Sequence, residues 1–269
     1  MSATFVDILQ EAVIKQQQGI PFVLATIVEG EAGSPGRTGF KVIAYKDGSF
    51  NGTVGGGKME KLILEKCAEI HKTKQNTLET FALSEDGIGM ACGGFAKVFY
   101  EYFPAKKRLY IFGAGHTCHS LAPIMLSLGF EIIVIDNREE FANEEKLPWA
   151  SEIYCQDYSE YVKNFQPEEN DAAIIITHGH IYDDVVLDGI CKKNPSMTYL
   201  GMIGSKVKVK QIVENIKSKN YEGDFISKIY SPIGLNIAKR TTEEIAVAIA
   251  AEILAVYNKV NDIKFMSRK

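Results

Sequence analysis

The feature that most constrains the fold of this chain is an alternation of apolar strand patterns with helical patterns through its second half. Strands are predicted at 109–112, 131–135, 152–154, 172–177, 198–203 and 226–230, and helices after Gly115 and at 158–164, 182–191, 206–217 and 242–257. Strands that alternate with helices form parallel sheets with crossover helices. Segments such as 172–176 are apolar throughout, as strands covered on both faces are. The sequence therefore predicts an α/β protein with a mostly parallel C-terminal sheet.

The first hundred residues follow a different pattern. A helical stretch precedes strand-like runs at 22–28, 40–45, 77–83 and 95–102, separated by glycine-rich loops, and we expect a smaller N-terminal α/β unit with mixed strands. The pattern changes after Pro104. Because 269 residues are enough for two domains, we predict an N-terminal domain at 1–104 and a C-terminal domain at 105–269.

A glycine turn in the second half points to a Rossmann-like domain. Gly113 and Gly115 follow a predicted strand, His116 opens a helix, and Asp136 ends the next strand. In dinucleotide-binding folds such glycines let a pyrophosphate approach the helix N-terminus, and an acidic residue about 20 positions on bonds the ribose. Asp136 would favour NAD over NADP, an effect that Arg138 would soften. The alternative is a vestigial site that keeps its glycines for packing.

Polar residues follow two further strands of this sheet. His178, His180 and Asp183 come after 172–177, where ligand groups gather in open α/β sheets. They suit proton transfer, metal binding or ligand contact, although Asp183 would also serve as a helix cap. Gly204 and Ser205 follow the next strand and suit an anion, or a plain helix cap.

Three loops of the N-terminal domain are candidate binding loops. The residues that we single out there are Arg37, Gly55, Gly56, Gly57, Lys58, Glu60, Cys92, Gly93 and Gly94. Glycines expose backbone amides, and Arg37 and Lys58 add positive charge. Cys92 is the candidate metal ligand or reactive thiol, because Cys67, Cys155 and Cys191 lie in apolar contexts typical of a core.

Composition narrows the class of partner. The net charge is −4, which disfavours general binding to nucleic acid or to an anionic membrane. No apolar run is long enough for a membrane span, and no signal peptide is evident, so we expect a cytoplasmic protein. Five widely spaced cysteines favour reduced thiols.

The motifs taken in order resemble the xanthine dehydrogenase accessory factor family, also called the XdhC/CoxI family. The segments that carry this resemblance are Ser34-Pro35 with Arg37, 52–60, Cys92-Gly93-Gly94, Gly113-Ala114-Gly115-His116, 177–183, 201–205, 231–237 and 241–246. It covers nearly the whole chain. Many members carry Cys where this chain has Lys58, so Cys92 is the best remaining thiol.

The resemblance implies a homodimeric protein that binds the molybdenum cofactor, assists its sulfuration by a cysteine desulfurase and delivers it to a molybdenum hydroxylase such as xanthine dehydrogenase. This describes a cofactor chaperone rather than a catalyst. The rival hypothesis is an NAD-dependent oxidoreductase with His178 or His180 as acid or base, and a third is a nucleotide-sensing protein. For the cofactor chaperone we expect the N-terminal loops and the C-terminal strand ends to share one site.

Overall fold

The computed structural model describes residues 5–30, 36–83, 94–219, 229–238 and 240–263. The chain divides into two compact units, 1–106 and 107–269. Cys92 and Gly93, both predicted site residues, lie outside the described residues, as does the segment 226–228 of the last predicted strand.

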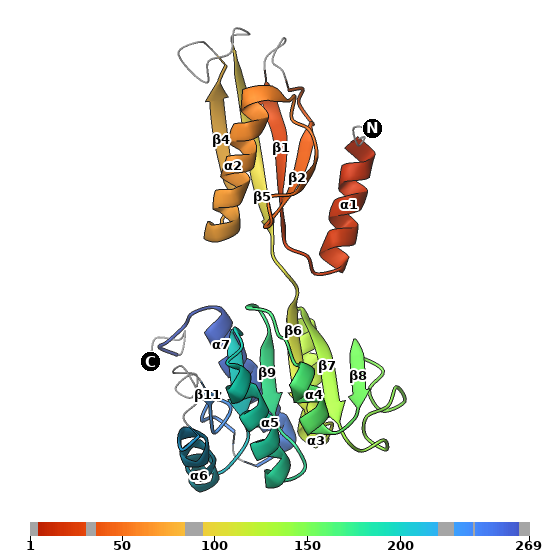
Figure 1. Cartoon of the computed structure of the whole chain (residues 1–269), viewed down its shortest axis with the longest axis vertical. Coiled ribbons are helices and arrows are strands. Elements are labelled where there is room, and N and C mark those ends of the chain that lie inside the picture. The colour runs from red at the N-terminus through yellow and green to blue at the C-terminus, as the bar shows by residue number, and fades with distance from the viewer. Residues whose placement is uncertain (1–4, 31–35, 84–93, 220–228, 239, 264–269) are drawn as a thin grey trace, which may run out of the picture. The chain divides into compact units, whose positions relative to one another are not determined.

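The N-terminal unit is an antiparallel sheet with a helix on each face (Figure 1). Its elements are α1 (Phe5–Gln17), β1 (Phe22–Gly30), β2 (Lys41–Tyr45), β3 (Phe50–Gly52), α2 (Gly57–Thr73), β4 (Thr77–Ala82) and β5 (Phe95–Phe103). The strand order is β3-β2-β1-β5-β4, and every pairing is antiparallel. The expectation of mixed strands is wrong here, because β1 to β3 and β4 to β5 are joined by direct reversals of the chain.

The two faces of this sheet bury separate apolar clusters. Met59, Ile63 and Cys67 of α2 pack on one face, while Ile8 and Ala12 of α1 pack on the other. The α2 residues recur at helical spacing, which is why the sequence pattern locates this helix. The helix begins at Gly57, the last residue of the glycine run, with Gly56 as its N-cap.

The C-terminal unit is a parallel sheet covered on both faces, as predicted. Its elements are β6 (Lys107–Phe112), α3 (His116–Ser127), β7 (Phe130–Asp136), β8 (Glu152–Cys155), α4 (Tyr158–Asn164), β9 (Ala172–Ile175), α5 (His180–Lys193), β10 (Tyr199–Met202), α6 (Lys206–Lys217), β11 (Ile229–Tyr230) and α7 (Thr242–Tyr257). The order is β11-β10-β9-β6-β7-β8, and all pairings are parallel.

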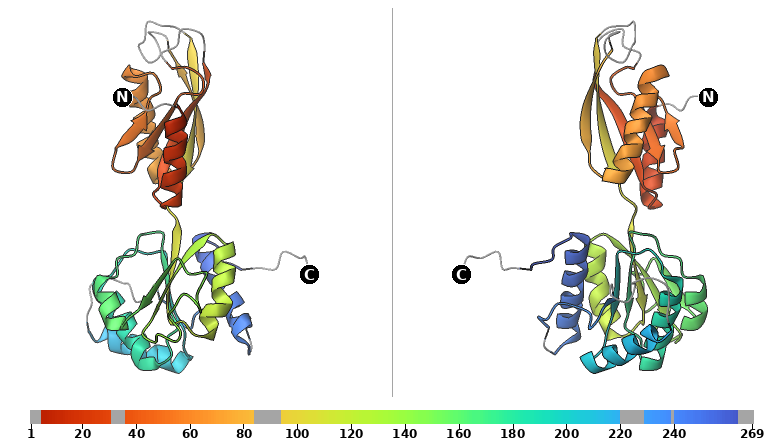
Figure 2. Two further views of the ribbon diagram at one scale, coloured as in Figure 1. Left: turned by 90° about the vertical axis from the view of Figure 1, so that its right-hand side faces the viewer. Right: turned by 60° about the vertical axis from the view of Figure 1, so that its left-hand side comes forward.

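Helices α3 and α7 cover one face of this sheet, and α4 and α5 cover the other (Figure 2). The chain leaves β6 toward β7 on one side and later returns to place β9 on the other. Such a reversal of strand order is a topological switch point, where open α/β sheets bind ligands. Both clusters are apolar, which accounts for the uninterrupted apolar strands in the sequence.

Cys155 corrects one prediction about the thiols. It ends the edge strand β8 and is exposed, whereas Cys67, Cys118 and Cys191 are buried. An apolar sequence context fails to predict burial here because an edge strand leaves its last side chain without a neighbouring strand to cover it.

Candidate functional site

Those predicted site residues of the N-terminal unit that the structure describes lie in loops next to the ends of its strands. The end of β1 and the start of β5 lie side by side, since Gly30 pairs with Ala96, and the amide of Leu83 donates to the carbonyl of Gly94 at 2.9 Å. Gly36, which precedes Arg37, lies against Val54, because a Cβ built on Gly36 would stand 2.3 Å from the Val54 carbonyl oxygen. The Arg37 loop and the glycine run are therefore neighbours.

The glycine run before α2 has a backbone that other residues rarely adopt. Gly55, Gly56 and Gly57 have φ values of 111°, 76° and 66°. A Cβ added to Gly56 or Gly57 would meet no atom within 4 Å, so open space borders this backbone. Within the described residues, no side chain caps the helix at Gly56, and Lys58 beside it is exposed. The start of α2 therefore presents amide donors and a cation to solvent, an arrangement suited to an anion.

Glu60 stabilises this loop instead of opposing an anion. Its Oε2 accepts hydrogen bonds from the Thr53 hydroxyl at 2.7 Å and from the Val54 amide at 3.2 Å. The Thr53 hydroxyl in turn accepts from the Gly55 amide at 3.2 Å. The carboxylate is thus directed back toward the chain before the helix, and it fixes the approach of the glycine run.

In the C-terminal unit, the Gly113 turn joins β6 to α3 as predicted from the sequence. Gly113 has φ 121°, and a Cβ on it would stand 2.4 Å from the carbonyl oxygen of Ile176. The end of β9 therefore passes directly beside the turn, which only glycine allows. Gly115 is the N-cap of α3, has no side-chain cap among the described residues, and is followed by the exposed His116.

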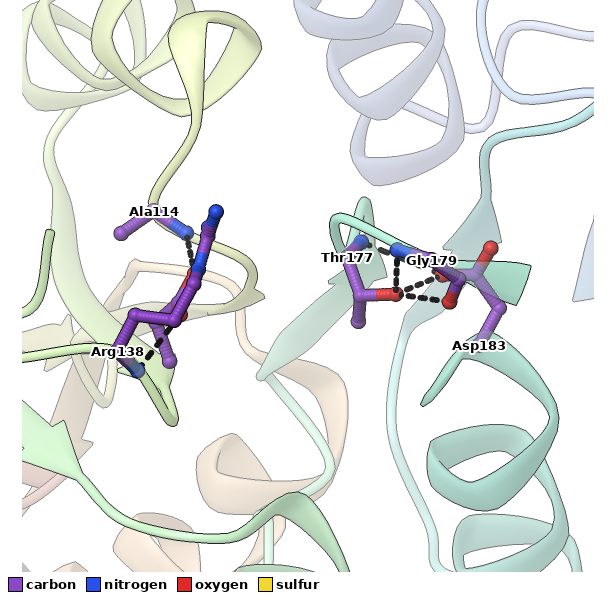
Figure 3. A network of polar contacts seen from close by, with 6 residues as sticks. Ala114, Arg138, Thr177, Gly179 and Asp183 are labelled. Carbon is purple, nitrogen blue, oxygen red and sulfur yellow. Dashed lines mark hydrogen bonds and ion pairs between the residues drawn. The ribbon is translucent and has the colours of Figure 1, made fainter. Parts of the chain in front are cut away.

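Asp136 is at the predicted position and bonds to Ala114 and Arg138, which are labelled in Figure 3. Oδ2 accepts from the Ala114 amide at 2.8 Å and from Nη2 of Arg138 at 2.7 Å, and Oδ1 accepts from Nε of Arg138 at 2.9 Å and its amide at 3.1 Å. The side chain is fully buried. Burial pushes the pKa of Asp136 upward, yet the hydrogen bonds from Arg138 and Ala114 outweigh it and lower that pKa.

These contacts change the expected role of Asp136. A carboxylate that accepts four hydrogen bonds from its own chain has to give up at least one before it can bond a ribose hydroxyl. Its negative charge is also compensated by the guanidinium of Arg138. The structure therefore removes the physical reason to expect repulsion of a ribose 2′-phosphate here.

A second group of polar residues at the carboxyl ends of the strands follows β9. The Thr177 hydroxyl donates to Asp183 Oδ1 at 2.6 Å, and the Thr177 amide donates to the same oxygen at 3.2 Å (Figure 3). Burial raises the pKa of Asp183, and these hydrogen bonds offset that only in part. Asp183 thus ties the end of β9 to the first turn of α5. Among the described residues the N-cap, Gly179, has no side-chain cap hydrogen bond, so Asp183 does not form the helix cap raised from the sequence.

The contacts of the remaining predicted residues at the strand ends do not define a chemical role for them. His178 is exposed and lies near the ring of Tyr182, with ring centroids 4.6 Å apart. His180 is the first residue of α5, and its side chain is outside the described atoms. Gly204 and Ser205 precede α6, with Ser205 exposed. Among the described residues, no group of three or more His, Cys, Asp or Glu side chains is arranged to hold a metal ion.

From the sequence, Arg138 is expected only to soften the NAD preference, and Phe141 and Tyr158 near Asp136 are left out. The guanidinium of Arg138 stacks over the ring of Phe141, with its carbon 3.9 Å from the ring centroid. Tyr158, the first residue of α4, is fully buried, and burial together with the nearby Asp136 carboxylate raises its pKa. The spacing of Arg138 and Phe141, three residues apart and directly after a strand, was the available signal.

Fold and site together define a two-unit α/β protein whose C-terminal unit is a Rossmann-type domain. The chain belongs to the XdhC family: a model described as the XdhC Rossmann domain matches residues 109–253, and a model of the XdhC and CoxI family matches residues 16–82. The resemblance seen in the sequence is thereby confirmed.

Two curated relatives and one solved structure are similar to this chain. The uncharacterized protein YqeB of Escherichia coli K12 is 28% identical over 94% of this chain and 46% of its own length. A protein of Bacillus subtilis 168 that is named as a probable subunit of xanthine dehydrogenase is 30% identical over 61% of this chain and 47% of its own length. The chain thus spans about half the length of these relatives.

The solved structure is a crystal structure of a xanthine dehydrogenase from Bacillus halodurans. It is 21% identical to this chain, with a TM-score of 0.53 and coverage of 96% of each chain. At that identity, the similarity supports the fold alone. No helix within the described ranges combines the length and apolar character that crossing a bilayer requires.

Proposed function

We propose that this protein is an accessory factor that binds the molybdenum cofactor, assists its sulfuration and delivers it to a xanthine dehydrogenase-type molybdenum hydroxylase. Membership of the XdhC family supports this proposal, as does the similarity to a relative named as part of a xanthine dehydrogenase. A cysteine desulfurase is the proposed sulfur source, and a homodimer in the cytoplasm is the proposed working form.

The glycine loop of the N-terminal unit is the observation that carries this proposal. The molybdenum cofactor is a pterin dithiolene that bears a phosphate, so it needs amide donors and positive charge. Open space borders the backbone at Gly56 and Gly57, and Lys58 places an ammonium group beside it. These residues fit the phosphate, and side chains larger than hydrogen would strain the left-handed backbone. When bound, the cofactor supplies the molybdenum chemistry that the recipient enzyme uses.

Three further residues have proposed roles around this loop. Glu60 positions it through Thr53 and Val54, as described above. Arg37 is exposed on the neighbouring loop, where it would add a second cation for the phosphate. Cys92 is the proposed thiol for the molybdenum end of the ligand, as the sequence suggests.

The C-terminal strand ends give little support to a catalyst. Asp183 bonds to Thr177, and His178 is exposed beside Tyr182. A histidine acid or base in a dehydrogenase is usually oriented by a carboxylate, and the buried carboxylate of this turn, Asp183, bonds to Thr177. The oxidoreductase therefore remains the weaker of the two functions.

The test is retention of the cofactor. Released molybdenum cofactor is incubated with the full chain, the mixture is gel filtered, and the molybdenum and pterin that elute with the protein are measured. Lys58→Ala should lower retention at least fivefold. Lys61→Ala is the matched control, because Lys61 is an exposed lysine one turn along α2 and faces Glu65 at 4.0 Å.

Transfer to an apo molybdenum hydroxylase tests the thiol. Cys92→Ser should fold normally and transfer less active cofactor than the parent protein. Unchanged transfer by Cys92→Ser would remove the thiol from the proposal, and absence of retention by the parent protein would overturn the proposed function itself.

A further inference from the structure

The position of Arg138 suggests a second ligand, one that the molybdenum cofactor does not explain. Its guanidinium is held from two sides, by the two-point ion pair with the buried Asp136 and by the ring of Phe141. A guanidinium fixed in this way loses little conformational entropy when it binds a ligand.

Arg138 still has hydrogen-bonding capacity. A guanidinium has five N–H donors, and two of them, one on Nε and one on Nη2, bond to Asp136, which leaves three. About a quarter of the side chain, 24%, is exposed. The residue therefore offers a rigid positive group with donors available, directly beyond the end of β7.

The position of the Arg138 guanidinium in the sheet indicates which part of a ligand it would contact. β7 lies next to β6, and β6 leads through the Gly113 turn into the start of α3. In doubly wound sheets a diphosphate lies at that helix start, and the adenosine ribose lies over the end of the following strand. An acidic residue there bonds a 2′-hydroxyl, and an arginine accommodates a 2′-phosphate. Here the acidic residue is buried, and the arginine is the exposed member of the pair.

We propose that the C-terminal unit binds an adenine nucleotide and that Arg138 makes this site selective for a phosphate on the 2′-oxygen of the ribose. The proposal reverses the NAD preference expected from Asp136 alone. It is independent of the proposed cofactor chaperone function, which rests on the N-terminal unit.

One nearby group works against anion binding. Glu140 lies close enough to contribute to a raised pKa of Arg138, after the larger contribution of the Asp136 hydrogen bond. Its negative charge would repel a 2′-phosphate through solvent. Neutralising Glu140 should therefore strengthen the binding that we propose.

The first experiment uses the parent protein and needs no variant. Isothermal titration with 2′,5′-ADP, 3′,5′-ADP and 5′-AMP compares a second phosphate at two ribose positions with its absence. We expect 2′,5′-ADP to bind at least tenfold more tightly than 5′-AMP and more tightly than 3′,5′-ADP. Equal or tighter binding of 5′-AMP or 3′,5′-ADP, or absence of binding by 2′,5′-ADP, would overturn the proposal.

Variants then assign the preference to Arg138. Arg138→Gln alone would strand the buried Asp136 charge, so the double variant Asp136→Asn, Arg138→Gln is the one to measure. It should bind 2′,5′-ADP and 5′-AMP equally, while the exposed Arg240→Gln should keep the tenfold preference. Glu140→Gln should raise the preference two- to threefold. A preference that survives in the double variant would contradict the assignment, whatever the outcome of the molybdenum cofactor experiments.

Discussion

The two units treat their polar groups in opposite ways. At the start of α2, the amides at Gly56 and Gly57 and the Lys58 side chain border open space, while the Glu60 carboxylate fixes the loop before them. At the strand ends of the C-terminal sheet, Asp136 and Asp183 are buried and bonded to their own chain. A motif that looks ligand-binding in sequence can therefore be a finished structural contact, and only its bonding partners distinguish the two cases.

The largest expected effect is at Gly113. Gly113→Ala places a methyl group near the Ile176 carbonyl on a backbone with φ 121°. Strain of about 1–3 kcal/mol and overpacking of about 1–3 kcal/mol should together destabilise the protein by about 4 kcal/mol. Thermal unfolding followed by circular dichroism measures this loss.

Gly115→Ala is the matched control on the same turn, because a Cβ there meets no atom within 4 Å and φ is −78°. It should change the free energy of unfolding by less than about 1 kcal/mol. Equal destabilisation by the two variants would show that the contact with Ile176 is not what requires Gly113.

The next effect concerns the ion pair between Asp136 and Arg138. Asp136→Asn leaves a partly buried guanidinium without its carboxylate, which should cost about 3 kcal/mol at neutral pH. Asp183→Asn should cost less than about 1 kcal/mol, because an amide oxygen can still accept both hydrogen bonds from Thr177. Urea denaturation at pH 7 compares the two variants, and a larger loss for Asp183→Asn would contradict this ranking.

The same two carboxylates should have opposite pH dependences. The pKa of Asp136 is lowered on folding, so its contribution to stability is present above about pH 4 and is lost as pH falls through the folded-state pKa. The pKa of Asp183 is raised, so its contribution is most favourable in acid and declines as pH rises from about 4 toward the folded-state pKa.

Free energies of unfolding measured between about pH 3 and pH 7 test these signs. Asp136→Asn should flatten the loss of stability on acidification, and Asp183→Asn should steepen it. Parallel curves for the parent and both variants would show that neither carboxylate has a shifted pKa.

A smaller effect is expected in the N-terminal unit. Glu60→Ala removes the acceptor for the Thr53 hydroxyl and the Val54 amide, which should cost about 2 kcal/mol. Glu60→Gln keeps one acceptor oxygen and should lose less. Limited proteolysis near residue 54 and thermal unfolding report this loss, and an unchanged melting temperature for Glu60→Ala would mean that the glycines fix the loop by themselves.

The smallest change involves no loss of stability. In a Cys92→Ser background, an aromatic disulfide reagent should modify one thiol rapidly in the native protein, that of the exposed Cys155. Burial raises the pKa of Cys67 and of Cys191 to about 12, and it also raises that of Cys118, so these thiols should react only on unfolding. Cys155→Ser should abolish the rapid phase, and persistence of that phase would contradict the assignment.

Much of the C-terminal fold could be predicted from the sequence because its signals are local. Apolar runs mark strands, and helical periodicity places α4 at 158–164 and α7 at 242–257, as the structure has them. Gly113 predicts the turn, because no other residue tolerates that backbone conformation so close to β9. These signals depend on neighbours in the chain, which a sequence displays.

The contacts of the site could not be predicted from the sequence, because they depend on which way a side chain points after a strand or helix ends. Nothing in the sequence shows that Arg138 folds back onto Asp136, or that Glu60 reaches Thr53 instead of solvent. The prediction of mixed strand directions in the N-terminal sheet was wrong for a related reason. Strand pairing in this sheet joins segments as distant in the sequence as β1 and β5. The prediction that Cys155 is buried was wrong because a sequence does not reveal which strand lies at the edge of the sheet.

The packing of α7 on α3 has a consequence for synthesis. Ala246, Ile249 and Ile253 of α7 complete the apolar cluster that Leu121 and Met125 of α3 begin. Once residues 1–106 have emerged from the ribosome, every element of the antiparallel unit has been synthesised. The Rossmann unit lacks the covering helix α7 until the segment up to Tyr257 emerges. During that interval α3 would expose apolar surface, the kind of intermediate that chaperones recognise. The elements around the glycine loop before α2 therefore emerge before any element of the Rossmann unit.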